Sequence, residues 1–247
     1  MSLATRKILP NLQEAKKLFV VIPAYNEGFS LSQVLLELKN LPFENYEAVV
    51  VDDGSKDHTC LVAKKAGVPI VSHPFNMGIG ITVQTGFRYA LEHGADLVVQ
   101  VDGDGQHIPS EIKKLFSSLL EKKADVVVGS RFLKHGKIGM ESTTFLRWMA
   151  GRILSWTVWL LTRQHLTDTT SGFRLFNKRA ADFIAYQYPD DYPEVEVLVS
   201  LARAGFKIIE VPVQMRSRQH GVSSINWWRA IYYVVKVFFA TCMEKIR

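Results

Sequence analysis

The sequence predicts an α/β fold in which a mostly parallel β-sheet is covered by helices. Short β-branched runs alternate with stretches of helical spacing, and the runs are apolar at almost every position, as expected for strands with both faces buried. The 247 residues, 47% of them hydrophobic, suffice for one generous domain spanning residues 1–247. The predicted strands are Leu18–Ile22, Ala48–Val51, Val68–Val71, Leu97–Val101 and Val126–Val128.

Amphipathic spacing predicts helices between these strands. Apolar residues recur every three or four positions in Leu31–Leu41, and Pro109–Leu120 opens with a proline in its first turn. A third helix, Ile81–Leu91, follows the glycine-containing loop Asn76–Gly80, which we interpret as structural because it lacks a third glycine at dinucleotide-binding spacing.

The pattern changes after Gly129. The remaining predicted elements are a loop rich in glycine and lysine (Lys134–Gly139), an aromatic helix (Phe145–Leu161), a turn rich in threonine and serine, a helix (Glu194–Ala204), a strand (Lys207–Val213) and an amphipathic terminal helix (225–247). Residues 1–17 are expected to form an N-terminal extension. We expect these later elements to serve an acceptor, and the front half to bind a nucleotide.

Charge and cysteine content limit the location and the partners. The formal net charge of +6 and the pI near 9.2 suit nucleotide phosphates or anionic lipid headgroups. No basic stripe with interleaved aromatics is visible, so nucleic acid is not an expected partner. Cys60 and Cys242 lack metal-ligand spacing, and the N-terminus does not resemble a secretion signal, so we expect free thiols and a cytoplasmic protein.

Acidic motifs follow three of the predicted strands. They read Pro23-Ala24-Tyr25-Asn26-Glu27, Val51-Asp52-Asp53-Gly54-Ser55 and Val101-Asp102-Gly103-Asp104-Gly105-Gln106-His107. Ligands of open α/β sheets bind beyond the carboxyl ends of the strands. One polar turn after a strand is common, but three at neighbouring strand ends predict a binding site.

The third motif predicts a metal site. Alternation along an extended segment would point Asp102 and Asp104 to one side, where two carboxylates repel unless a cation lies between them. Mg²⁺ or Mn²⁺ takes oxygen ligands, which commonly include oxygens of substrate phosphates. Gln106 offers a further oxygen.

The second motif predicts contact with a nucleobase. Asp53 would accept a hydrogen bond from an imino or amino group, and Tyr25 or Val51 would pack on the ring. The alternative is that Asp53 or Ser55 caps a helix beginning near Asp57.

Together with Gly129-Ser130-Arg131, these motifs resemble glycosyltransferase family 2, most closely the branch of dolichyl-phosphate mannose synthase and the bacterial polyprenyl-phosphate glycosyltransferases. The resemblance runs from about Phe19 to Ser224 and implies a GT-A fold. It further implies a nucleoside site made by Pro23, Tyr25, Glu27, Val51 and Asp53, and a diphosphate and metal site made by Asp102, Gly103, Asp104 and Gln106.

Arginines and the acceptor side complete the implied site. Arg131 follows a strand, where its planar fork suits a phosphate, and the resemblance assigns phosphates to Arg147 and Arg218 as well. The family pattern usually has lysine where this chain has Ser224. The acceptor therefore stays open between a lipid phosphate and a hydroxyl, and a hydroxyl would need a carboxylate base. The predicted acceptor-side residues are Arg147, Asp168, Glu194 and Glu196.

Two aromatic segments predict peripheral contact with the inner face of a membrane. Phe145–Leu161 and Ile225–Met243 place tryptophans and other aromatics beside arginine or lysine, a mixture that favours the headgroup boundary. Packing on the sheet, on a second copy of the chain or on a membrane protein is the alternative. Neither segment has the roughly 18 uncharged apolar residues of a membrane span.

The function predicted from these features is inverting, metal-dependent transfer of a sugar from a nucleotide-diphosphate sugar, with polyprenyl phosphate as the expected acceptor. Asp102, Asp104 and Arg131 are the predicted catalytic residues. A nucleotidyltransferase would need a glycine-rich loop with arginine or lysine after the first strand, and Pro23–Phe29 lacks one. A module that binds nucleotide-sugar without turnover is the non-enzymatic alternative.

Overall fold

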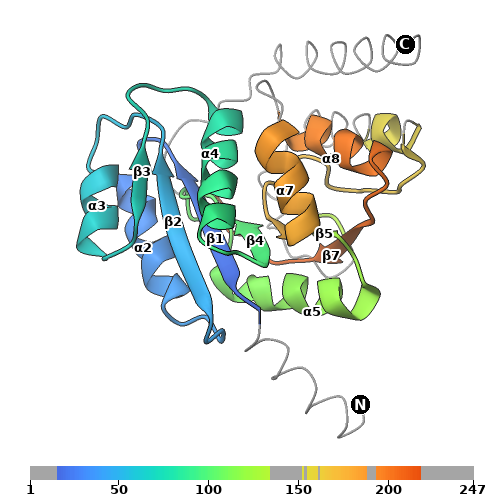
Figure 1. The fold of residues 1–247 in the computed structure, drawn as a ribbon, viewed down its shortest axis with the longest axis horizontal. Helices are drawn as coiled ribbons and strands as arrows, with labels where there is room; N and C mark the ends of the chain where they lie inside the picture. The colour runs from blue at the N-terminus through green and yellow to red at the C-terminus, as the bar shows by residue number, and fades with distance from the viewer. Residues whose placement is uncertain (1–15, 134–151, 153–154, 161, 188–192, 218–247) are drawn as a thin grey trace, which may run out of the picture.

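A seven-stranded sheet forms the centre of the computed structural model, which describes residues 16–133, 152, 155–160, 162–187 and 193–217 (Figure 1). The strand order is β3-β2-β1-β4-β6-β5-β7, and only β6 runs against its neighbours. The strands are β1 (Leu18–Ala24), β2 (Tyr46–Asp52), β3 (Ile70–Ser72), β4 (Leu97–Gln100), β5 (Val126–Ser130), β6 (Arg174–Asn177) and β7 (Ile208–Pro212). The predicted mostly parallel sheet is confirmed.

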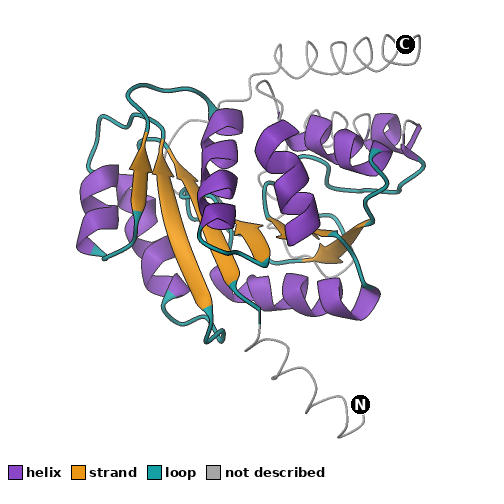
Figure 2. Cartoon of the chain, viewed as in Figure 1, coloured by secondary structure: helices purple, strands orange, loops and turns teal. Residues whose placement is uncertain are grey.

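Helices cover both faces of the sheet (Figure 2). On one face lie α2 (Gly28–Leu38), α3 (Thr59–Lys65) and α5 (Ile112–Lys122), the last preceded by a 3₁₀ turn at Pro109–Glu111. On the other face lie α4 (Ile79–Glu92), α7 (Lys178–Gln187) and α8 (Pro193–Arg203). None of the helices in the described part of the chain is long and apolar enough to cross a membrane.

Burial on both faces explains why the strands are apolar throughout. In β1, Phe19 and Val21 join the core under α4, whereas Val20 and Ile22 join the core under α2 and α5. All seven β1 residues are buried. Each strand therefore contributes side chains to two cores, as the sequence pattern predicts.

The antiparallel strand β6 was not predicted. It lies between β4 and β5, where Arg174 pairs with Gln100 on one side and with Val128 on the other. Because β6 runs in the opposite direction, its first residue lies at the carboxyl edge of its neighbours. The turn that precedes β6, residues 167–173, is thereby placed beside the ends of β4 and β5.

Other boundaries differ from the prediction. β4 ends at Gln100 instead of Val101, and β3 begins at Ile70 instead of Val68. Helix α7 follows β6 without a linker and was missed, whereas residues 155–160 are helical as expected. Four predicted segments lie outside the described residues: Lys134–Gly139, the start of the aromatic helix, residues 1–15 and the terminal helix at 225–247.

Candidate active site at the carboxyl edge of the sheet

The three acidic motifs meet at one rim. The end of β1 lies between them: the Asp53 N–H donates to the Ala24 carbonyl (2.9 Å), and the Gly103 N–H donates to the Pro23 carbonyl (3.1 Å). The second and third motifs thus flank the first, as expected for the carboxyl ends of adjacent parallel strands.

Asp102 is an acidic side chain of this rim that is partly open to solvent. Its side chain is 32% exposed, and the Gln100 amide donates to Oδ1 (3.0 Å). The Asp102 N–H donates to His107 Nδ1 (2.9 Å), and the buried imidazole stacks on Phe173 with ring centroids 4.9 Å apart. Gln100 and His107 therefore fix the position of Asp102 from behind.

Asp104 is held differently from Asp102. Residues 103–105 form a turn, so the extended alternation expected for Asp102 and Asp104 is wrong. Asp104 is 8% exposed, and its Oδ1 accepts the Gln106 N–H (3.0 Å), a bond that closes the turn. Within the described ranges, no group of three or more His, Cys, Asp or Glu side chains is arranged to hold a metal ion.

Arg131 emerges directly after β5, as predicted, but its fork already holds a carboxylate. Nε and Nη2 donate to Asp168 Oδ2 (2.8 Å) and Oδ1 (2.7 Å), and Nη2 also donates to the Thr170 hydroxyl (2.9 Å). Burial alone would lower the pKa of Arg131, but the hydrogen bonds and charge of Asp168, with the charge of Asp102, raise it. Among the described residues, Nη1 has no hydrogen-bond partner and is the nitrogen left for a phosphate.

The predicted acceptor contact of Asp168 is corrected by this arrangement. Its side chain is fully buried and accepts from the Arg131 backbone N–H (2.8 Å) as well as from the guanidinium. A carboxylate so enclosed positions Arg131 and cannot reach an acceptor.

Glu210 of β7 supports Asp168, and sequence reasoning missed it. Its two carboxylate oxygens accept the N–H groups of Asp168 and Thr167, both at 2.7 Å. Burial raises the pKa of Glu210, and the neighbouring charge of Asp168 adds to this effect against the lowering by these hydrogen bonds. The residue pattern of the predicted strand Lys207–Val213 does not indicate that Glu210 faces the turn before β6.

The turn before β6 connects the two halves of the rim. A Cβ placed on Gly172 would lie 3.2 Å from Asp102 Oδ2 and 3.0 Å from the Gln100 amide nitrogen, so the turn packs directly on Asp102. Asp102 also contributes to the raised pKa of Arg131, which puts the two charges within electrostatic reach. The predicted catalytic residues Asp102 and Arg131 therefore share one site.

The nucleoside residues are partly rearranged relative to the prediction. Tyr25 is 43% exposed and can pack on a ring. Val51 is fully buried beside Gly86 of α4, so its side chain cannot pack on a ring, and that part of the prediction is corrected. Pro23 is buried, and Glu27 accepts from the Ser30 hydroxyl (2.9 Å) at the start of α2.

Asp53 does not cap the helix that follows it. The N–H of Thr59, the first residue of α3, donates to Asp57 (2.9 Å), so the alternative of a cap from Asp53 or Ser55 is wrong. Asp53 instead accepts the N–H groups of Met77 and Gly78, both at 2.9 Å, at the start of α4. This supports a structural role for the loop Asn76–Gly80.

The remaining predicted residues are placed only in part. Arg147 and Arg218 lie outside the described residues. Glu194 and Glu196 are in α8, where Glu196 is half-buried. The backbone N–H of Arg216 donates to the Gln106 carbonyl (2.9 Å), so the segment after β7 runs beside the third acidic motif.

Comparison with known proteins identifies the family. A profile described as glycosyl transferase family 2 matches residues 19–184, well over half of the chain. The chain belongs to glycosyl transferase family 2. The match includes all three acidic motifs, Arg131 and the turn before β6, and the predicted glycosyltransferase is confirmed.

Curated relatives of this family are similar over most of the chain. The UDP-N-acetylglucosamine–dolichyl-phosphate N-acetylglucosaminyltransferase of Methanococcus voltae is 31% identical over 81% of this chain and 85% of its own length. The undecaprenyl-phosphate mannosyltransferase of Micrococcus luteus is 31% identical over 85% of this chain and 88% of its own length.

Solved structures show the same fold. Glucosyl-3-phosphoglycerate synthase from Mycobacterium tuberculosis, crystallised with Mn²⁺ and UDP-glucose, superposes with a TM-score of 0.67. The alignment covers 96% of this chain and 82% of that chain at 20% identity. At this identity, the likeness supports the GT-A-type fold only.

Proposed function

We propose that this family 2 glycosyltransferase moves a sugar, with inversion, from a nucleotide-diphosphate sugar to a polyprenyl phosphate at a membrane surface. The observation that carries the proposal is the meeting of the strand ends at one rim, where a partly exposed Asp102 lies within electrostatic reach of Arg131. The names of the relatives, which act on dolichyl and undecaprenyl phosphates, support the acceptor class.

The chemical step is a displacement at the anomeric carbon. An oxygen of the acceptor phosphate forms a bond to that carbon, the bond to the donor diphosphate breaks, and the diphosphate leaves with the electron pair. Negative charge therefore grows on the diphosphate, and we assign its stabilisation to Arg131, acting through Nη1 while Nε and Nη2 bind Asp168. Asp168 keeps the guanidinium oriented, which reduces reorganisation during the reaction.

The residue types at this rim suit a hard cation that the nucleotide-sugar donor also binds. Asp102, Asp104 and Gln106 offer oxygen ligands, and two carboxylates with an amide leave coordination positions for phosphate oxygens. These residues would hold Mg²⁺ or Mn²⁺, which supplies charge stabilisation at the departing diphosphate. Glucosyl-3-phosphoglycerate synthase, which has the same fold, was crystallised with Mn²⁺ and UDP.

A phosphate acceptor needs positioning more than a base. The second pKa of a phosphate monoester is about 6, so its attacking oxygen is ionised at neutral pH. We assign Arg147 and Arg218 to substrate phosphates by their place in the family motifs. A hydroxyl acceptor would instead require Glu194 or Glu196 as a base, because Asp168 is enclosed.

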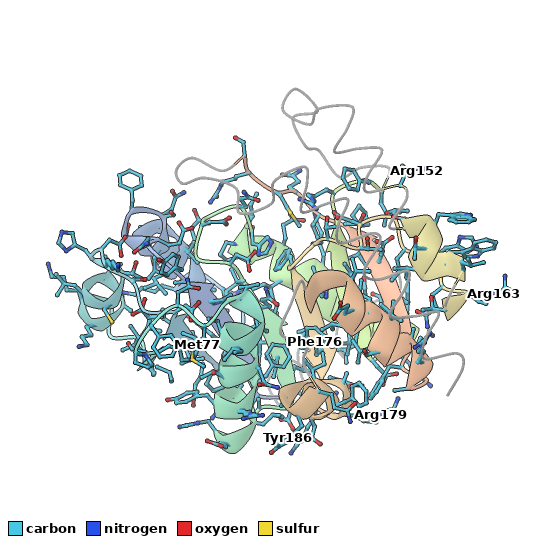
Figure 3. All side chains as sticks on the ribbon, turned by 90° about the horizontal axis from the view of Figure 1, so that it is seen from above. Met77, Arg152, Arg163, Phe176, Arg179 and Tyr186 are labelled. Carbon is cyan, nitrogen blue, oxygen red and sulfur yellow. The ribbon has the colours of Figure 1, made fainter. Side chains whose placement is uncertain are left out.

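Membrane contact is proposed for the aromatic helix. Trp156 and Leu160 are 59% and 42% exposed, and the exposed Arg152 and Arg163 belong to the same region. Figure 3 shows both arginines at the end of the molecule remote from Met77. Aromatic side chains beside cations suit a headgroup layer. Sedimentation with phosphatidylglycerol vesicles should be weakened by Trp156→Ser and unchanged by Leu36→Ser, which alters an exposed leucine on α2.

A product-extraction assay tests the whole proposal. Labelled UDP- and GDP-sugars are incubated with the protein, Mn²⁺ and undecaprenyl phosphate, and label entering the organic phase is counted, with and without EDTA. We expect label in the organic phase only with the lipid and the metal. Label that moves only to a water-soluble saccharide would support a hydroxyl acceptor, and no transfer from any sugar nucleotide would refute the proposal.

A further inference from the structure

Among the described residues, three donors hold the buried carboxylate of Asp53 and leave it one acceptor position. His73 Nδ1 (2.8 Å) and the Met77 N–H (2.9 Å) both contact Oδ1, whereas the Gly78 N–H (2.9 Å) contacts Oδ2. An ionised carboxylate has about four lone-pair positions, two on each oxygen. Oδ1 is therefore saturated, and Oδ2 can accept one further hydrogen bond.

The groups that hold Asp53 cannot easily turn away. Gly78 has φ +93°, which lets its N–H face Asp53, and a Cβ on Gly54 would lie 2.6 Å from the Phe75 backbone carbon. The loop is therefore packed tightly against the Asp53 turn. On the other side, His73 Nε2 lies 3.0 Å from the Thr85 hydroxyl of α4, so the imidazole is fixed between Asp53 and that helix.

A second influence is the start of α4. Asp53 accepts two backbone N–H groups beside the first residues of this helix, where the macrodipole favours a negative charge. Figure 3 shows Met77, one of these donors, next to α4. The carboxylate is thus kept in one orientation, with protein donors on both oxygens.

We propose that this arrangement selects uracil, so that the donor is a UDP-sugar, and that His73 is a specificity-determining positioning residue. The inference rests on the proposed function and names its donor class. Uracil presents one imino N–H between two carbonyl groups, which matches one free acceptor position on Oδ2 of Asp53. The donors on Oδ1 offset the charge with which this oxygen would otherwise repel a uracil carbonyl.

Other bases fit this position less well. Guanine presents an imino and an amino donor side by side, which requires both carboxylate oxygens, so one of its donors would stay unmatched beside Asp53. Cytosine and adenine place a ring-nitrogen acceptor next to their amino group, and that lone pair would face the carboxylate. An unmatched polar group in a buried site lowers affinity by about tenfold or more.

Calorimetric titration of UDP and of GDP, each with Mn²⁺, tests this inference. We expect UDP to bind at least about tenfold more tightly than GDP. Equal or tighter binding of GDP would overturn the selection of uracil while leaving the proposed function intact. Failure of both nucleotides to bind would overturn the proposed function and this inference together.

Variants of His73 separate its role from a structural one. In His73→Ala, Oδ1 regains an acceptor position, so the ratio of UDP to GDP affinity should fall severalfold. In His73→Asn, the amide nitrogen replaces Nδ1 and the ratio should return. His93→Ala, at the far end of α4, is the matched control and should leave the ratio unchanged.

Thermal unfolding of each variant shows whether it is folded. An unchanged ratio in folded His73→Ala would overturn the role of His73. If His73→Ala does not fold, the ratio in His73→Asn and the unaltered chain decides: a preference for UDP in both supports the inference, and its loss in His73→Asn overturns the role of His73.

Discussion

Two buried carboxylates lie on either side of Asp102 along the sheet edge, and they are satisfied differently. Asp53, after β2, accepts three hydrogen bonds from uncharged backbone groups and His73. Asp168, before β6, accepts three bonds of 2.7–2.8 Å from Arg131 and one of 3.4 Å from Thr170. Asp53 therefore keeps one acceptor position for a ligand, whereas all the acceptor positions of Asp168 are filled.

This difference indicates which acidic residues can act on a substrate. A carboxylate whose acceptor positions are all filled by the protein positions other groups, as Asp168 positions Arg131. A carboxylate with open positions and some exposure, such as Asp102, can bind a ligand. Sequence motifs alone do not separate these cases, because all three residues follow or precede strands at the same edge.

The largest expected effect comes from Asp102→Asn. The substitution keeps the shape but removes a charge placed for the metal and diphosphate, so sugar transfer should fall by about 10²–10³-fold or more. Asp104→Asn should act in the same way. Stability should change little, because Asp102 is one-third exposed. The extraction assay measures transfer, and Asp182→Asn on the exposed face of α7 is the control. Full activity of Asp102→Asn would contradict its assigned role.

The second prediction compares the two buried carboxylates directly. Asp168→Asn leaves the mostly buried Arg131 facing an amide, and breaking such a pair costs about 3 kcal/mol or more. Asp53→Asn disturbs hydrogen bonds from two backbone N–H groups and His73, and should cost about 1–2 kcal/mol. Urea unfolding measures both, and Glu47→Gln, in a surface pair with Lys17, should cost no more than about 0.5 kcal/mol. A larger loss for Asp53→Asn than for Asp168→Asn would contradict the comparison.

The front half of the fold was predictable because its signals are local. Strands buried on both faces give unbroken apolar runs, and β1, β2, β4 and β5 were found from such runs. Strand β6 was missed because it begins with Arg174, a fully buried arginine that interrupts the apolar pattern. Helix α7 was missed because it starts immediately after β6, without a turn signal.

The candidate site was predictable in its members but not in their contacts. Placement of the motifs at strand ends brought Asp102 and Arg131 to one rim, as expected. The pairing of Arg131 with Asp168, 37 residues away, depends on the antiparallel direction of β6, which no local pattern revealed. His73 and Glu210 were missed because each acts through a partner that is remote in sequence.

The smallest expected effect concerns the pH dependence of stability on the side of Asp168. Burial raises the pKa of Glu210 above its ordinary value of 4.5. An acid whose folded pKa is raised binds protons more strongly in the folded state, so its ionisation reduces stability as the pH rises above 4.5. Glu210→Gln has no such ionisation. The free energy of unfolding of the unaltered chain, minus that of Glu210→Gln, should therefore decline between pH 4.5 and neutrality.

Asp125 provides a control of opposite sign. Burial acts to raise its pKa, but hydrogen bonds from Lys207, Asn177 and Arg179 lower it below the ordinary 3.8. Its contribution to stability is thus present above pH 3.8 and is lost as the pH falls below that value. Urea unfolding of Asp125→Asn should show the difference shrinking in acid, whereas the Glu210 difference shrinks toward neutral pH. A Glu210 difference that stays constant above pH 4.5 would mean that the carboxylate supporting Asp168 titrates as an ordinary surface group.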